Sequence, residues 1–138
     1  MKKIIVLVGV LTILTGCATS SHKVAVQTVQ ENGYGSVKLA DGSVYSGEIE
    51  GITGEGFGTI ESKDGTYTGA VRNGVPHGFG KTVTKDGAIY HGEHNKGEFH
   101  GRGQLILSDG SYFMGYMKHN KVDRGTMHFT DGRTVPVR

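Results

Sequence analysis

Residues 58–69, with the sequence GTIESKDGTYTG, contain the pattern that decides the fold of this chain. A glycine is followed six residues later by Asp-Gly, and shortly afterwards by an aromatic residue, one further residue and glycine. The Asp-Gly pair recurs at spacings of 23, 22, 23 and 22 residues, with its aspartates at Asp41, Asp64, Asp86, Asp109 and Asp131. Such a period is typical of repeat proteins, in which each unit buries its apolar face by stacking on its neighbours.

The residues around these glycines favour strands and turns over helices. Glycine recurs every few residues, and each glycine in a helix interior costs about 1 kcal/mol. Asp-Gly suits the positive φ angles of tight hairpin turns, and the runs on both sides are rich in Thr, Val, Ile and Tyr. We therefore expect an all-β fold over residues 32–138, in which consecutive β-hairpins form one elongated, twisted antiparallel sheet. The aromatic residue follows Asp64 by three positions and Asp41 by four, which predicts turns of different types.

Alternation of side chains along a strand assigns the aromatic residues to one apolar face of this sheet. The glycine two positions after each aromatic residue leaves room for a neighbouring ring. Thr82 and Thr84 occupy apolar positions within residues 81–85 and break the pattern there. No helix is expected to cover this face, so we identify its rings as the candidate interaction face: Tyr45, Tyr67, Tyr90 and Phe113.

The first 16 residues have the composition of a secretory signal peptide. A basic start at Lys2 and Lys3 precedes the apolar run from Ile4 to Ile13, which is too short to cross a bilayer as a permanent helix. We therefore expect residues 1–16 to form a signal helix that is cleaved from the mature protein.

The residues Leu14-Thr15-Gly16-Cys17 resemble the box of bacterial lipoproteins, which is cut before its cysteine. The resemblance implies that Cys17 becomes the lipidated N-terminus, which carries palmitate and ties the protein to a membrane. Ala18 implies, by the sorting habit of that family, an outer-membrane anchor with the protein facing the periplasm. Residues 17–31 then form a polar tether, to which Val24 to Val29 can add a short strand. An ordinary signal peptide that contains cysteine is the alternative.

The charge balance argues against two kinds of partner. Two of the 15 Lys and Arg residues lie in residues 1–16, which leaves 13 against 13 Asp and Glu residues. A balanced chain lacks the basic footprint of nucleic-acid binding and the polybasic patch that binds acidic lipid head groups. We therefore expect no nucleic-acid partner.

Tyr-x-Gly, a turn, Gly-x-Gly and Asp-Gly, repeated in this register, resemble the MORN repeat (membrane occupation and recognition nexus). Its inter-repeat segment is matched by residues 73–80, NGVPHGFG, and by residues 96–103, KGEFHGRG. The resemblance covers residues 33–138 and implies an elongated, twisted sheet of successive hairpins. The family usually carries Trp two residues after the Tyr-x-Gly glycine, where this chain has Ile49, Val71, His94 and Met117. The last Gly-x-Gly is changed to Asp123-Arg124-Gly125, as is common for a terminal unit.

No residue pattern in this sequence predicts catalysis or a cofactor. Residues 54–58, GEGFG, lack the Lys-Ser/Thr of a phosphate loop, and the repeat explains their glycines. His77 and His100 share one repeat position, while His91 and His94 are expected on opposite faces of a strand, which is poor geometry for a shared metal. We therefore expect no catalytic residue, no metal site and no cofactor.

Three classes of function fit these features unequally. We expect a membrane-anchored, non-catalytic interaction or scaffolding module of the bacterial envelope, because an apolar face and open edges favour a protein partner or self-association. A lipid- or glycan-binding module is the alternative, suggested by the family name and the row of Tyr. An enzyme is the third class. Some eukaryotic phosphoinositide kinases carry MORN repeats beside a catalytic domain, but the repeat region here leaves no room for one.

Overall fold

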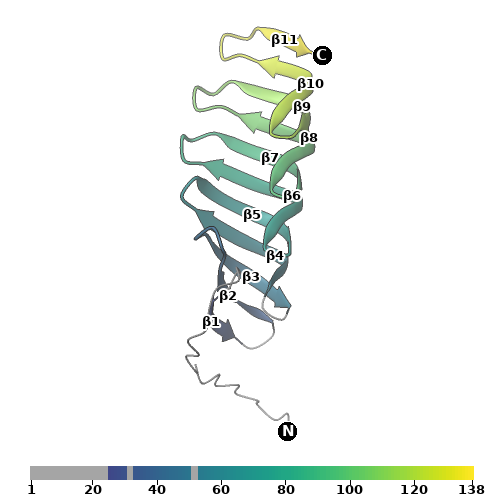
Figure 1. Cartoon of the computed structure of the whole chain (residues 1–138). Coiled ribbons are helices and arrows are strands. Elements are labelled where there is room, and N and C mark those ends of the chain that lie inside the picture. Colours follow the sequence, from purple (N-terminus) through teal and green to yellow (C-terminus); the bar gives the residue numbers. More distant parts are fainter. Residues whose placement is uncertain (1–24, 31–32, 51–52) are drawn as a thin grey trace, which may run out of the picture.

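The computed structural model describes residues 25–30, 33–50 and 53–138, and these residues form a single antiparallel sheet (Figure 1). Its eleven described strands lie side by side in the order of the chain. Their bounds are Ala25–Gln30 (β1), Tyr34–Lys38 (β2), Val44–Glu50 (β3), Thr53–Ser62 (β4), Gly65–Arg72 (β5), Val75–Thr84 (β6), Ile89–Asn95 (β7), Glu98–Ile106 (β8), Tyr112–Lys118 (β9), Lys121–His128 (β10) and Thr134–Val137 (β11). The described residues contain no helix, and the predicted all-β fold of consecutive hairpins is confirmed.

Of the two segments predicted before residue 32, only the second is described in part. The signal peptide over residues 1–16 and Cys17 lie outside the described part of the chain. Strand β1 falls within the predicted tether, residues 17–31, and pairs with β2. It therefore covers an edge of β2 that would otherwise expose unpaired backbone groups.

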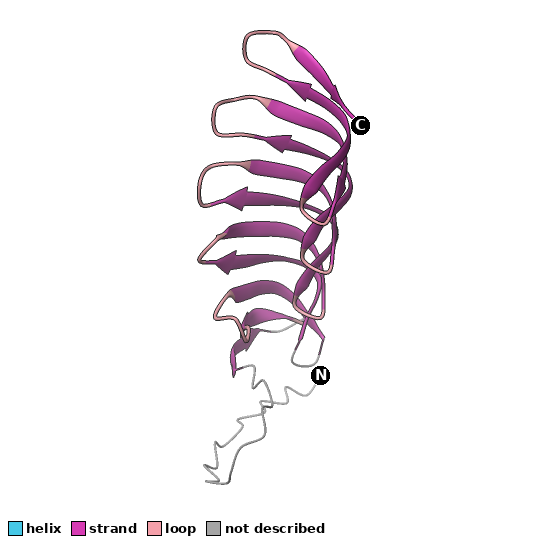
Figure 2. Ribbon diagram, turned by 45° about the horizontal axis from the view of Figure 1, so that its top comes forward, coloured by secondary structure: helices cyan, strands magenta, loops and turns pink. Residues whose placement is uncertain are grey.

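Three described turns of two residues each lie along one margin of the sheet (Figure 2). Asn73-Gly74 joins β5 to β6, Lys96-Gly97 joins β7 to β8, and His119-Asn120 joins β9 to β10. Every residue of these three turns has a positive φ. Positive φ at both positions gives a turn whose twist matches that of the strands it joins. These three tight turns therefore lie between the Asp-Gly pairs, where the sequence did not place them; the tight turns were expected at the pairs themselves.

The Asp-Gly pairs form the other margin and mostly make longer loops. Between β2 and β3, Gly42 has a φ of 87°, and the Asp41 carboxylate accepts a hydrogen bond from Ser43 N at 2.9 Å. The aspartate therefore closes the loop through its side chain. Between β4 and β5, the connection is only Lys63 and Asp64. The β2–β3 loop spans residues 39–43, whereas the β4–β5 turn has two residues. The turns therefore differ in type, as the sequence spacing predicted.

A row of paired glycines crosses the sheet from β2 to β10. In chain order, each pairs with the next: Gly35, Gly47, Gly58, Gly69, Gly80, Gly92, Gly103, Gly115 and Gly125. A second row runs parallel to it, in which Tyr67 pairs with Ile60 on one side and with Thr82 on the other. Large rings therefore stand beside a strip of bare backbone.

Next to the glycine row, bulges interrupt the pairing of β3 with β4, β5 with β6, β7 with β8, and β9 with β10. In the third of these pairs, Gly92 faces Gly103 and His94 faces Phe99, so one residue of β7 lies opposite three of β8. Bulges bend a strand and increase its twist. We attribute the curl of the sheet toward its aromatic side to these bulges, which let a single layer of strands enclose its own core.

The core consists of residues that alternation placed on the apolar face. Its buried apolar members are Val37, Tyr45, Ile60, Tyr67, Val71, Tyr90, Phe113 and Met117. All of these except Val37 pack in two clusters, one around Tyr45 and Tyr67 and the other around Tyr90 and Phe113. The assignment of these residues to one face is confirmed.

Candidate interaction surface

Each buried tyrosine ring lies in a socket made by glycine. A Cβ atom at Gly103 would overlap the ring of Tyr90, which therefore occupies the space of the missing side chain. Phe99 stacks on the same ring, with 4.1 Å between the ring centroids. Equivalent sockets are made at Gly58 for Tyr45 and at Gly80 for Tyr67. The glycine row is thus the complement of the aromatic row.

The tyrosine hydroxyls bind the backbone at the bulges. Tyr90 Oη donates to the carbonyl oxygen of Glu93 at 3.0 Å, and Glu93 is the residue of β7 that faces the bulge. The other two hydroxyls do the same, Tyr45 to Glu48 O at 2.6 Å and Tyr67 to Ala70 O at 2.5 Å. Burial raises the pKa of all three tyrosines to about 12. The tyrosine hydroxyls therefore stay protonated, and their hydrogen bonds help to hold the bends in the strands.

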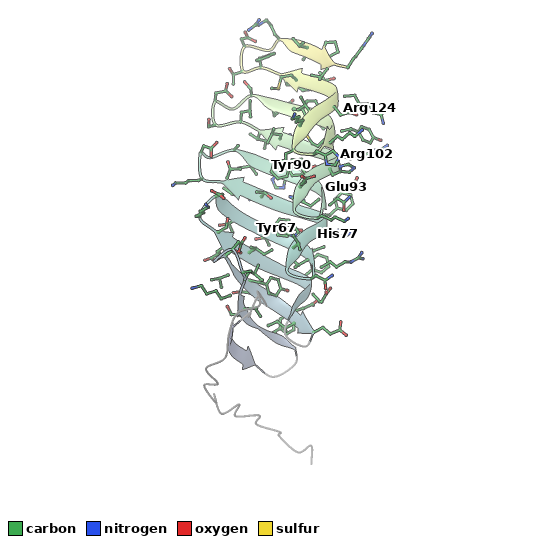
Figure 3. All side chains as sticks on the ribbon, viewed as in Figure 1. Tyr67, His77, Tyr90, Glu93, Arg102 and Arg124 are labelled. Atoms are coloured by element: carbon green, nitrogen blue, oxygen red, sulfur yellow. The ribbon has the colours of Figure 1, made fainter. Side chains whose placement is uncertain are left out.

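The rings predicted as the interaction face belong to this core. Tyr45, Tyr67, Tyr90 and Phe113 are between 0% and 4% exposed. The sequence predicted that this apolar face would be uncovered. In the structure, the sheet curls over its own apolar face and buries these rings. Figure 3 shows Tyr67 and Tyr90 within the curl, while Arg102 and Arg124 project from its outer side. A partner that docks on the folded chain therefore meets other side chains.

The apolar pattern fails at Thr82 and Thr84, and the structure explains each by a hydrogen bond. His94 is buried, and its Nε2 lies 2.9 Å from Thr82 Oγ1, while its Nδ1 lies 3.1 Å from the carbonyl oxygen of Gly92. Burial lowers the pKa of His94, an effect partly opposed by the hydrogen bond to Gly92. Thr84 instead bonds to Ala88 across the β6–β7 loop. The departures from the pattern are thus a matched core pair and a loop contact.

The outer face carries a row of outward-facing residues, exposed or half-buried, that we call the outer stripe. Its members are the middle residues of the Gly-x-Gly segments and their partners on the intervening strands. From β2 to β10 they are Tyr34, Glu48, Phe57, Ala70, Phe79, Glu93, Arg102, Tyr116 and Arg124. Phe57 and Phe79 are each 67% exposed, and Tyr34 is 51% exposed. Large aromatic rings at equivalent positions of successive repeats are therefore open to solvent.

The far end of the outer stripe is cationic. The guanidinium carbon of Arg102 lies 5.4 Å from the centroid of the Tyr116 ring, and that of Arg124 lies 4.7 Å from it. Arg102 Nε also donates to Tyr116 Oη at 2.7 Å. Two guanidinium groups thus rest on one ring through cation–π contacts and remain exposed.

Two glutamates of the outer stripe support its backbone. Glu48 accepts a hydrogen bond from Phe57 N at 3.1 Å and another from the Tyr34 hydroxyl at 3.1 Å. Glu93 accepts one from Arg102 N, also at 3.1 Å. These carboxylates cap backbone N–H groups at the bulges and so fix the direction of the exposed side chains.

A groove runs along the outer side of the glycine row between β6 and β9. Its volume is about 670 Å³, and its floor is the backbone of the paired glycines. Phe79, Arg102 and Tyr116 form one wall, while Gln104 and Met114 stand on the other. Aromatic, cationic and amide groups thus face one open channel.

The described residues hold no group of three or more His, Cys, Asp or Glu arranged for a metal ion. His91 is exposed and His94 buried, so they lie on opposite faces as predicted. The ring of His100 lies against that of His119, whose Nδ1 is 2.7 Å from Glu98 Oε2. His94, His100 and His119 therefore take part in ring and hydrogen-bond contacts within the sheet.

Sequence reasoning did not identify the outer stripe as a surface. The signal was present in the middle residues of the four Gly-x-Gly segments, Tyr34, Phe57, Phe79 and Arg102, and in Arg124 at the equivalent position of the changed last segment. Side chains alternate along a strand, so the residue between two inward-facing positions points outward, and the sequence could have placed these residues on the outer face.

Comparison with protein-family models finds two consecutive MORN repeats, at residues 67–89 and 90–112. Each begins with a buried tyrosine, Tyr67 or Tyr90, whose ring fills a glycine socket. No curated protein matches the chain. Within the described residues, no helix has the length and apolar character needed to cross a membrane.

Proposed function

We propose that this chain, which belongs to the MORN repeat family, is a non-catalytic interaction module of the bacterial envelope. MORN repeats are commonly protein- or membrane-interaction modules, and the family is generally non-catalytic. In this proposal, a lipid on Cys17 holds the protein at the outer membrane on its periplasmic side. The sheet then presents its outer stripe to a protein partner.

The exposed aromatic row is the observation that carries this proposal. Phe57 and Phe79 are not part of the core, and each has two thirds of its surface exposed to water. Contiguous exposed apolar residues mark interaction sites, and aromatic residues and arginine are enriched at the centres of protein interfaces. The outer stripe carries aromatic residues or arginine at its five repeat-equivalent positions, with Glu48, Ala70, Glu93 and Tyr116 between them.

Crosslinking in intact cells tests the interaction. We expect wild-type protein to give defined crosslinked products, and Phe57→Ser combined with Phe79→Ser to lose them while the fold is kept. Ala40→Ser, in an exposed Asp-Gly loop, is the matched control and should retain the products. Unchanged products in the double variant would place the interaction elsewhere.

The membrane anchor is tested separately at Cys17. The box at residues 14–17 supports lipidation, so wild-type protein should incorporate labelled palmitate and sediment with membranes. Cys17→Ala should release the protein from membranes or leave it unprocessed. Wild-type protein without palmitate label would contradict the anchor and leave the interaction surface in place.

A lipid- or glycan-binding module is a second candidate, favoured by the outer groove. Phe79 and Tyr116 offer ring faces there, while Arg102 and Gln104 offer polar groups between them. Retention of the protein on isolated cell-wall glycan or on vesicles, lost in Arg102→Ser with Tyr116→Ser, would support this candidate over a protein partner.

A further inference from the structure

The outer stripe has an order that is self-complementary. Its five repeat-equivalent positions are aromatic at Tyr34, Phe57 and Phe79, and cationic at Arg102 and Arg124. Phe79 is the middle of the five, so rings lie on one side of it and guanidinium groups on the other. We infer that the outer stripe binds a second copy of this chain in antiparallel orientation, about a two-fold axis at Phe79. This inference rests on the proposed function.

Such an axis brings a ring and a guanidinium group together at four of the five positions. Phe57 meets Arg102 of the second copy, Tyr34 meets Arg124 of the second copy, and the reverse pairs form by symmetry. Phe79 meets its own counterpart at the axis. Arginine over an aromatic ring is a favourable pair, and reciprocal contacts of this kind define an isologous interface.

The guanidinium groups are placed for these contacts. Both lie on the Tyr116 ring, and the Arg124 side chain is 69% exposed. Side chains already held in one orientation lose less freedom on binding. The carboxylates of Glu48 and Glu93 are engaged with backbone N–H groups of their own chain. Arg124 has a long, exposed contact with Asp123, at 3.9 Å. Arg102 bonds to the Tyr116 hydroxyl, so both guanidinium groups keep open faces for a second copy.

The area of the outer face suits a dimer. Strands lie about 4.8 Å apart, so the face from β2 to β10 is roughly 40 Å long. Each strand presents about three outward-facing side chains, so the face is roughly 15 to 20 Å wide, since alternate residues on a strand are about 7 Å apart. The product is roughly 600 to 800 Å² for a flat face. Because the outer face is convex, each copy buries less than this, at the small end of specific interfaces.

A cysteine at the axis tests this arrangement in the full chain. In bacterial cells treated with a short bifunctional thiol reagent, Phe79→Cys should give a covalent homodimer of twice the chain mass. Wild-type protein, whose own cysteine is Cys17, and Ala40→Cys are the controls and should not give it.

A charge exchange then tests which residues meet. Phe57→Arg added to Phe79→Cys opposes two arginines, and should lower the homodimer yield at least roughly tenfold because like charges repel across an interface. Adding Arg102→Phe as well restores an arginine opposite a ring and should restore the yield. Lys81 lies beside Phe79 on the same face and meets its own counterpart, so Lys81→Thr should raise the yield.

The outcomes separate this inference from the proposed function. A homodimer that is indifferent to Phe57→Arg, or that the exchange with Arg102→Phe fails to restore, would overturn the antiparallel stripe. Crosslinks from Phe79→Cys to other proteins alone would also overturn it, yet would leave the interaction module standing. Absence of any crosslinked product would overturn both.

Discussion

Two aromatic rows cross this sheet with the same repeat period, yet one is buried and the other is exposed. Tyr90 of the inner row is 0% exposed, while Phe79 of the outer stripe is 67% exposed. Tyr90 stands two residues from its glycine, Gly92, whereas Phe79 stands one residue from Gly80. Successive side chains of a strand point to opposite faces, so position relative to the glycine row decides the outcome. The inner row builds the fold, and the outer row is free to bind.

The largest effect is expected where a glycine makes a socket for the inner row. Gly103→Val would place a branched side chain in the space of the Tyr90 ring. We expect a loss of about 3 kcal/mol by overpacking, or roughly 10 to 20 °C in thermal midpoint. Glu61→Gln, an exposed position on β4, is the control and should change stability by less than about 0.5 kcal/mol. Equal shifts for both variants would contradict the socket.

A smaller effect is expected from the inner-row hydroxyls. Tyr90→Phe leaves the Glu93 carbonyl without its donor, which should cost about 1 to 3 kcal/mol in urea unfolding. The reverse change, Phe113→Tyr, should not stabilise the protein. The bulge beside Phe113 has only Asp123 as an extra residue, so an added hydroxyl overpacks it by about 1 kcal/mol or more. A gain in stability from Phe113→Tyr would show that the shorter bulge also needs a donor.

The smallest effect on stability is expected from pH, through the polar pair of the inner row. Burial lowers the pKa of His94 in the folded chain, so the unfolded chain takes up a proton first as pH falls. The contribution of His94 to stability is therefore complete above about pH 6.5 and is lost as pH falls from there toward the folded pKa. Thr82→Ile with His94→Val introduces the residues found at the equivalent positions one repeat earlier, Ile60 and Val71, and should flatten this dependence. Urea unfolding at several pH values measures the difference between the two proteins.

Much of the inner row could be predicted from the sequence, because alternation and the glycine spacing are local rules. Tyr45 and its equivalents fell on the predicted face, and the different spacings after Asp41 and Asp64 correctly predicted that the turns differ. Thr82 stood out as an exception, but its partner His94 lies on the neighbouring strand, where only strand register brings the two together.

The exposure of each face could not be predicted in the same way. An open sheet without helices was expected to leave its apolar face uncovered. The bulges changed this result, since extra residues such as His100 and Gly101 bend β8 beside the glycine row. Sequence spacing does not reveal which residues of a Gly-x-Gly segment leave the ladder, so the covered inner row and the exposed outer stripe emerged only from the structure.

The most direct test of the account compares one ring from each row in the same two assays. Tyr67→Ser and Phe79→Ser each remove one aromatic side chain, and both are measured by thermal unfolding and by crosslinking in intact cells. We predict that Tyr67→Ser lowers stability by about 3 kcal/mol or more, because a buried ring is lost. Phe79→Ser should leave stability within about 0.5 kcal/mol and reduce the crosslinked products. A stable Tyr67→Ser protein, or a Phe79→Ser protein that unfolds easily and keeps its crosslinks, would contradict the division between a row that folds and a row that binds.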